Sequence, residues 1–204
     1  MRYRRLGRTG VHISNVTLGG SFFGTRISER DSSLILDRSL ELGINAVDTA
    51  ESYLKPDPHA SETVLGRILK GRRDDVFLAS KVGPSRPWET QGVNLGLTRR
   101  VVNQAVEGSL RRLQTDHIDL YIIHWPDKHC PMETTLRALD VAIRQGKIRY
   151  FGASNHSAAQ LCELLWLADK GLGPRVVSSQ IPYSMLLRHF EHDLPWCAQK
   201  QIAI

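Results

Sequence analysis

Apolar residues along the chain follow two patterns that alternate from the beginning to the end of the sequence. Short apolar runs, as in buried strands, are followed by longer segments with apolar residues at helical spacing. Residues 3–14 predict a β-hairpin ahead of the first of these runs. The predicted strands cover residues 16–20, 44–48, 75–81, 117–124, 147–155, 175–180 and 201–204. The predicted helices cover residues 28–43, 61–69, 98–113, 132–146, 157–171 and 188–200, the last begun or kinked by Pro195.

The signals between these segments support the same division. Ser28 with Asp31 resembles a capping box, and Gly43 ends the first helix. Strand and helix alternate every ~25–45 residues, which is typical of βαβ units and a parallel sheet. No composition shift, low-complexity segment or Pro/Gly linker divides the sequence, so we expect a single domain over residues 1–204.

The ends of the predicted strands distinguish between two parallel architectures. An open dinucleotide-binding sheet carries GxGxxG after its first strand, whereas "VTLGGSFFG" has a different spacing. A barrel instead gathers the carboxyl ends of all its strands at one mouth. The residues at these ends are Gly19 with Gly20, Asp48, Lys81, His124, Ser154 with Asn155, and Gln180. Because most of them can take part in chemistry, we predict an α/β fold of the barrel type.

Composition and charge indicate an ordinary globular protein. The 204 residues are 41% hydrophobic and 24% charged, and no apolar run approaches the roughly 20 residues that span a bilayer. The net charge is +6, but basic and acidic residues interleave, so we expect no nucleic-acid partner. The scattered Cys130, Cys162 and Cys197 fit a reduced cytosol, and the basic start lacks the apolar segment of an export signal. We expect a cytoplasmic protein that makes no membrane contact.

Four residues at or just beyond the strand ends could act together in one chemical reaction. Singly, Asp48, Tyr53, Lys81 and His124 each have a structural explanation, such as capping, packing or surface charge. Together, a lysine ammonium would lower the pKa of a nearby tyrosine, and a carboxylate would keep that lysine charged. A histidine could donate a hydrogen bond to a carbonyl oxygen. The set therefore predicts a tuned general acid beside a site that polarises a carbonyl group.

A site of this kind needs a hydride donor from elsewhere, and a nicotinamide cofactor is the obvious carrier. Its carboxamide needs donors and acceptors, which Ser154, Asn155 and Gln180 would supply. A metal-dependent barrel hydrolase using residues 124–130 is an alternative, but it lacks further ligands at the other strand ends apart from Asp48. We expect no metal.

Several stretches resemble the aldo-keto reductases in order, spacing and context. They are "INAVDTAESY", "FLASK", "IDLYIIHWPD", "GKIRYFGASN" and "SSQIPYS". The start, "YRRLGRTGVHISNVTLGG", is similar to that family's N-terminal hairpin and first strand. The resemblance implies a (β/α)8 barrel and the reduction of aldehydes or ketones to alcohols with NADPH or NADH.

The resemblance also implies roles for individual residues. Tyr53 would be the acid, and Asp48 and Lys81 would modulate it. His124 would orient a small-molecule carbonyl substrate. The substrate pocket would be lined by aromatic residues, namely Phe22, Phe23 and Trp125.

The length of the sequence is a departure from the family. A barrel of this type usually needs about 250 residues, so we expect a barrel that is incomplete at the C-terminus. The chain would stop within the seventh strand, without the eighth strand and the last helices. Unpaired strand edges would then favour self-association. Within the same family, the alternative is a non-catalytic or regulatory barrel, because a fold alone does not guarantee turnover.

Overall fold

Six parallel strands form one curled sheet in the computed structural model, which describes residues 1–53, 57–83 and 96–204. The strands are β3 (Leu18–Gly19), β4 (Ala46–Asp48), β5 (Phe77–Val82), β6 (Ile118–Ile123), β7 (Ile148–Ser154) and β8 (Val176–Gln180). The α-helices are α1 (Glu29–Glu41), α2 (Ala60–Ile68), α3 (Arg99–Leu113), α4 (Met132–Arg144), α5 (Ala158–Asp169) and α6 (Leu194–Gln199). Short 3₁₀ helices are η1 (Arg73–Asp75) and η3 (Glu191–Asp193).

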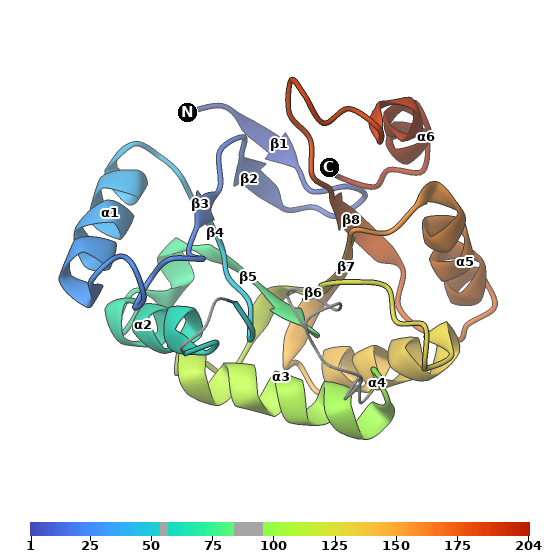
Figure 1. Cartoon of the computed structure of the whole chain (residues 1–204), viewed down its shortest axis with the longest axis horizontal. Coiled ribbons are helices and arrows are strands. Elements are labelled where there is room, and N and C mark those ends of the chain that lie inside the picture. The colour runs from blue at the N-terminus through green and yellow to red at the C-terminus, as the bar shows by residue number, and fades with distance from the viewer. Residues whose placement is uncertain (54–56, 84–95) are drawn as a thin grey trace.

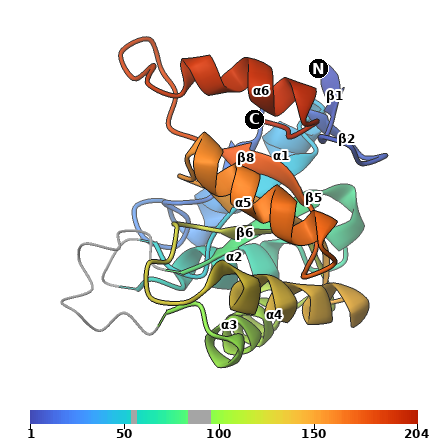
Figure 2. The same ribbon diagram turned by 90° about the vertical axis from the view of Figure 1, so that its right-hand side faces the viewer.

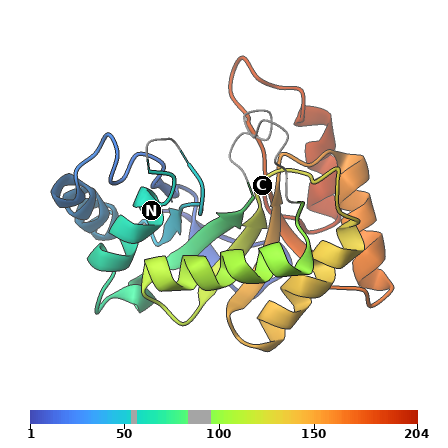
Figure 3. The same ribbon diagram turned by 60° about the horizontal axis from the view of Figure 1, so that its bottom comes forward.

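The order of the strands in the sheet is their order in the sequence. A doubly wound sheet reverses its strand order at a switch point, whereas a barrel does not. Helices α1 to α5 follow the outer side of the curled sheet in sequence order, as Figures 1 and 3 show. The fold is therefore α/β of the (β/α)8 type, as the strand ends predicted.

The last predicted strand, residues 201–204, is present as a single parallel bridge between Ala203 and Ser178. The Ala203 amide donates to the Val177 carbonyl at 2.9 Å, and the Ala203 carbonyl accepts from the Ser179 amide at 2.8 Å. This part of the chain lies next to β8, and α5 and α6 lie on the outside (Figure 2).

The N-terminal hairpin is formed by β1 (Tyr3–Arg5) and β2 (His12–Ser14), as predicted. Between its strands, Leu6 packs on apolar residues of the sheet that point into the barrel, with Ala79, Leu120, Ile122 and Val177 in the same cluster. Gly7 has a φ of 52°, and a Cβ atom there would lie 2.4 Å from the Val177 carbonyl oxygen. The hairpin thus presses against β8 and closes the amino-terminal end of the strands.

The main hydrophobic core lies between the sheet and the helices. Its largest fully buried side chains include Tyr121 and Phe151 from the sheet and Leu36, Leu65 and Leu136 from the helices. Helices α2 and α3 touch where α2 carries Gly66, because a Cβ atom there would lie 2.1 Å from the Arg112 carbonyl oxygen.

The helix ends confirm part of the predicted capping. The Ser28 hydroxyl accepts from the Asp31 amide at 3.1 Å, but it donates to the Asp31 carboxylate instead of completing a capping box. A complete capping box joins Ser157 and Gln160. Of the predicted helix 188–200, the α-helical part begins at Leu194 with Pro195 in its first turn, and residues 191–193 form the 3₁₀ helix η3. No helix in the described residues is long and apolar enough to cross a membrane.

Candidate active site

The pairing of neighbouring strands brings the predicted site residues to one edge of the sheet. Asp48, the last residue of β4, pairs with Gly19 and Ala79. Lys81 lies two residues beyond Ala79 on β5. The His124 amide, just past β6, donates to the Val82 carbonyl at 3.0 Å. The carboxyl ends of β4, β5 and β6 therefore place these three side chains at the same mouth.

Lys81 is the centre of the site. Its side chain is 3% exposed, and its ammonium group donates to Asp48 Oδ2 at 2.6 Å. It also donates to the Thr49 carbonyl at 2.8 Å and to the Tyr53 hydroxyl oxygen at 2.9 Å. The three ammonium protons thus have three acceptors, which fixes the position of the charge next to the phenol.

The expectation that Lys81 lowers the pKa of Tyr53 is wrong for this structure. Burial, followed by the Asp48 carboxylate, raises the pKa of Tyr53 above its ordinary value. Burial also lowers the pKa of Lys81, and the Asp48 carboxylate opposes that shift. The physical reason is that a shielded site disfavours the charged form of both groups, and the negative charge of Asp48 further disfavours a phenolate. Tyr53 therefore keeps its proton near neutral pH.

His124 lies beside the phenol as a neutral ring. Its centroid is 6.1 Å from that of Tyr53, with the two rings at 88° to each other. Burial, followed by the charge of Lys81, lowers the pKa of His124 to about 3. A neutral imidazole carries one N–H donor and one acceptor, so near neutral pH it can donate a hydrogen bond without adding a charge.

The amide residues lie at the ends of the next two strands. The Asn155 side-chain amide donates to the His124 carbonyl at 2.9 Å and to Ser154 Oγ at 3.0 Å. The Asn155 backbone amide donates to the Gln180 carbonyl at 3.0 Å. Asn155 has a φ of 59°, a conformation that asparagine tolerates better than most residues. Ser154, Asn155 and Gln180 thus form one polar ledge next to His124.

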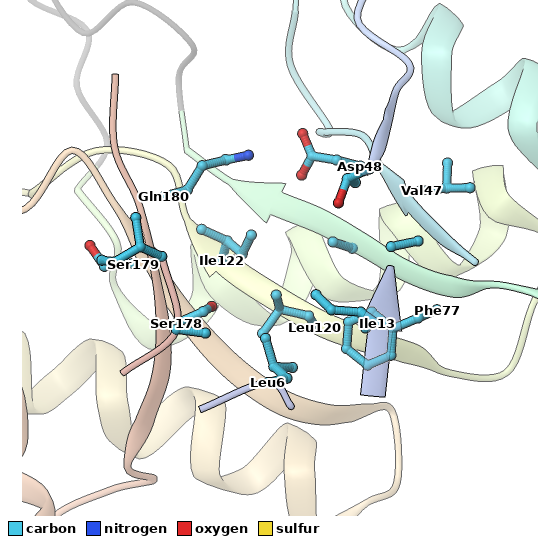
Figure 4. A pocket seen from close by; sticks show the side chains of 15 residues that line it. Leu6, Ile13, Val47, Asp48, Phe77, Leu120, Ile122, Ser178, Ser179 and Gln180 are labelled. Atoms are coloured by element: carbon cyan, nitrogen blue, oxygen red, sulfur yellow. The ribbon is translucent and has the colours of Figure 1, made fainter. Parts of the chain in front are cut away.

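A cavity of about 150 Å³ lies inside the curled sheet below these residues (Figure 4). Asp48 and Gln180 lie at one end of it on opposite sides, and Leu6, Leu120 and Phe77 line the other end. Of the predicted site residues, Asp48 and Gln180 line this cavity, whereas Tyr53, Lys81 and His124 are not among its lining residues.

The residues of this site lie within a region of the sequence that matches a known protein family. The model of the Aldo/keto reductase family matches residues 15–204. This chain belongs to the aldo/keto reductase family. The resemblance of the strand-end motifs to that family is therefore confirmed.

Several members of the family are close relatives of this chain. Protein tas from Escherichia coli (strain K12) is 38% identical over 98% of this chain and 65% of its own length. Methylglyoxal reductase YeaE from the same organism is 37% identical over 95% of this chain and 63% of its own length. The structure of aldo-keto reductase AKR11C1 from Bacillus halodurans (holo form) superposes with a TM-score of 0.84 at 35% identity. That match covers 99% of this chain and 64% of the other, so this aldo/keto reductase chain spans less than two thirds of the length of these relatives.

The aromatic residues expected in a substrate pocket have different surroundings in this family member. Phe23 is 1% exposed and belongs to the main hydrophobic core, so its burial favours a packing role. Phe22 is 37% exposed, and the Arg26 guanidinium lies 4.8 Å from its ring centroid. Trp125 is half-buried directly after His124.

Behind the site lies a buried charged cluster that the sequence interpretation missed. Glu62 on α2 is fully buried and accepts from Ser80 Oγ at 2.6 Å and from Arg112 Nε at 2.7 Å. Arg112 Nη2 lies 4.0 Å from Glu51 Oε2. The spacing of Glu62 from Leu65 places both on the buried face of α2, and this was the one signal available in the sequence.

Proposed function

We propose that this chain carries the proton-donating site of a nicotinamide-dependent reductase that converts aldehydes or ketones to alcohols. The observation that carries the proposal is the Lys81 ammonium, which donates to Asp48 and Tyr53 together at the strand-end mouth. The family of the chain and the name of the relative YeaE support the same class of reaction.

Tyr53 acts as the general acid in this proposal. Its raised pKa keeps the proton on the phenol until negative charge develops on the substrate oxygen. As the proton leaves, the phenolate is stabilised by the hydrogen bond from Lys81, which Asp48 holds in place. The neutral His124 ring donates a hydrogen bond to the same carbonyl oxygen and orients it toward Tyr53.

The ledge of Ser154, Asn155 and Gln180 fits the carboxamide of a nicotinamide cofactor, NADPH or NADH. A carboxamide needs both donors and acceptors, and two amide side chains and a hydroxyl at adjacent strand ends offer both. A reduced nicotinamide supplies the hydride when it is bound. The residues of the ledge bind and orient that ring.

The substrate is a small carbonyl compound that enters beside Phe22 and Trp125. Methylglyoxal, which the name of the relative YeaE specifies for that protein, is the first compound to try. We measure cofactor binding by fluorescence titration and turnover by the loss of reduced nicotinamide, with the alcohol product identified separately. Saturable binding with formation of the alcohol supports the proposal. Cofactor binding without turnover on any carbonyl compound would favour a non-catalytic member of the family.

The ledge has its own test in Gln180→Leu, which keeps the size of the side chain and removes its donor and acceptor. The loss of one or two hydrogen bonds predicts that the Kd for the reduced cofactor rises by roughly tenfold. Gln199→Leu on α6 is the matched control, because Gln199 is exposed and does not line the cavity beside Gln180. An unchanged Kd in Gln180→Leu would remove Gln180 from the binding site.

A further inference from the structure

The segment from Thr49 to Tyr53 is held in place although it has no regular secondary structure. Its backbone follows β5: the Thr49 amide donates to the Ala79 carbonyl at 2.9 Å, and the Glu51 amide donates to the Lys81 carbonyl at 3.2 Å. The Tyr53 amide donates to the Pro58 carbonyl at 3.1 Å. The position of the Tyr53 phenol relative to Lys81 therefore depends on how this segment lies against β5.

Glu51, at the middle of the segment, makes further hydrogen bonds through its side chain and its backbone carbonyl. Its Oε1 accepts from the Gly83 amide at 2.9 Å, directly after β5 ends. Gly83 has a φ of 101°, which only glycine adopts readily, so the turn at this point presents its amide toward Glu51. The Glu51 carbonyl also bonds to the His59 ring at the start of α2. Glu51 thus joins the tyrosine segment to the ends of two other elements.

A guanidinium group lies behind the Glu51 carboxylate. Arg112 Nη2 lies 4.0 Å from Glu51 Oε2, and it is buried with no hydrogen-bond partner among the described residues. Its Nε is bonded to the fully buried Glu62, so the side chain cannot turn away. Burial raises the pKa of Glu51, while the Gly83 bond and the Arg112 charge oppose this shift. The carboxylate is therefore placed by a bond to Gly83 and balanced by a fixed positive charge.

We propose that Glu51 is a positioning residue for Tyr53, which ties the 49–53 segment to the end of β5 through the Gly83 amide. This inference rests on the function proposed for Tyr53. The bond to Gly83 needs only an acceptor oxygen, so an amide at position 51 preserves it and a methyl group does not. The Glu51 carboxylate is bonded to Gly83 and faces Arg112, so Glu51 acts through the position of Tyr53.

The test compares Glu51→Ala with Glu51→Gln and with Glu163→Ala, a control on the exposed face of α5. Cofactor sites are counted by fluorescence titration, so turnover is expressed per binding site and a partly unfolded preparation does not imitate the effect. We expect Glu51→Ala to lower kcat per site by about tenfold or more, because small displacements of a catalytic group are costly. We expect its KM for the carbonyl compound to stay within about threefold of the wild type.

Glu51→Gln restores most of the turnover if the acceptor for Gly83 is what matters, and Glu163→Ala matches the wild type. Wild-type kcat per site in Glu51→Ala, or equal losses in the alanine and glutamine variants, would overturn the inference. A second readout does not depend on turnover: the NMR signal of the Tyr53 ring in tyrosine-labelled protein, assigned with Tyr53→Phe. The signal should move in Glu51→Ala and not in Glu51→Gln. If the wild type has no activity, the proposed function is refuted but the positioning role is not. An unmoved Tyr53 signal in Glu51→Ala would refute the positioning role.

Discussion

The buried ion pair between Glu62 and Arg112 gives a prediction about stability that needs no cofactor. Glu62 is 0% exposed, and its carboxylate has the Ser80 hydroxyl at 2.6 Å and Arg112 Nε at 2.7 Å. Arg112→Met keeps much of the side-chain volume but removes the counter-charge. Breaking a buried pair in this way costs about 3–5 kcal/mol, because it leaves a charge without compensation.

We therefore expect Arg112→Met to lose about 3–5 kcal/mol of unfolding free energy. For a chain of this size, this loss lowers the Tm by roughly 6–20 °C.

The assay is urea unfolding followed by circular dichroism. Glu62→Gln combined with Arg112→Met should recover part of the loss, because a neutral amide still accepts from Ser80, while Glu51 still lacks the Arg112 charge. The control is Arg137→Met on α4, whose partner Glu133 forms an exposed pair with side chains 59% and 44% exposed. That substitution should change stability by less than about 1 kcal/mol. Equal losses in Arg112→Met and Arg137→Met would refute the reasoning.

Two further predictions concern stability. The pKa of His124 is lowered to about 3, so between about pH 6.5 and about pH 3 the unfolded chain binds a proton that the folded chain does not. The unfolding free energy of the wild type therefore falls as the pH falls. His124→Gln should remove about 2 kcal/mol of the loss between about pH 6.5 and about pH 5, measured by urea titrations. Identical pH profiles in the wild type and His124→Gln would contradict this. A Cβ atom at Gly66 would lie 2.1 Å from the Arg112 carbonyl, so Gly66→Ala should cost about 1–3 kcal/mol or more in thermal unfolding. Gly10→Ala, with no atom within 4 Å of the new Cβ, should be nearly neutral, and equal effects would contradict the close helix contact.

The architecture and the meeting of the strand-end residues could be predicted from the sequence for the same reason. In a parallel sheet with strands in sequence order, the residue at each strand end must face the same mouth, so Asp48, Lys81 and His124 come together without knowledge of any other contact. Each of the six strands in the sheet is one to three residues shorter than predicted; residues 16–17 and 20, for example, lie outside β3, and residues 44–45 lie outside β4. These limits depend on which backbone groups find partners across the sheet, which no periodicity specifies.

The features that were not predicted depend on burial and on distant pairs. The direction of the Tyr53 pKa shift follows from how far the surrounding atoms exclude water, and the sequence indicates only the neighbouring charges. Phe23 is a core residue because the turn after β3 folds back onto the helices. The pair of Glu51 and Arg112 joins a loop to a helix that lies far later in the sequence. Such contacts follow from packing of the whole chain.

The central claim is that Tyr53 donates the proton to the substrate, and Tyr53→Phe tests it most directly. The variant keeps the ring and removes only the hydroxyl that Lys81 contacts at 2.9 Å. We predict that the Kd for the reduced cofactor stays within about threefold, while kcat falls by about 10²–10⁴-fold, the usual worth of a general acid. Cofactor binding and turnover would be measured on the same preparation. Turnover within a few-fold of the wild type, with cofactor still bound, would contradict the account.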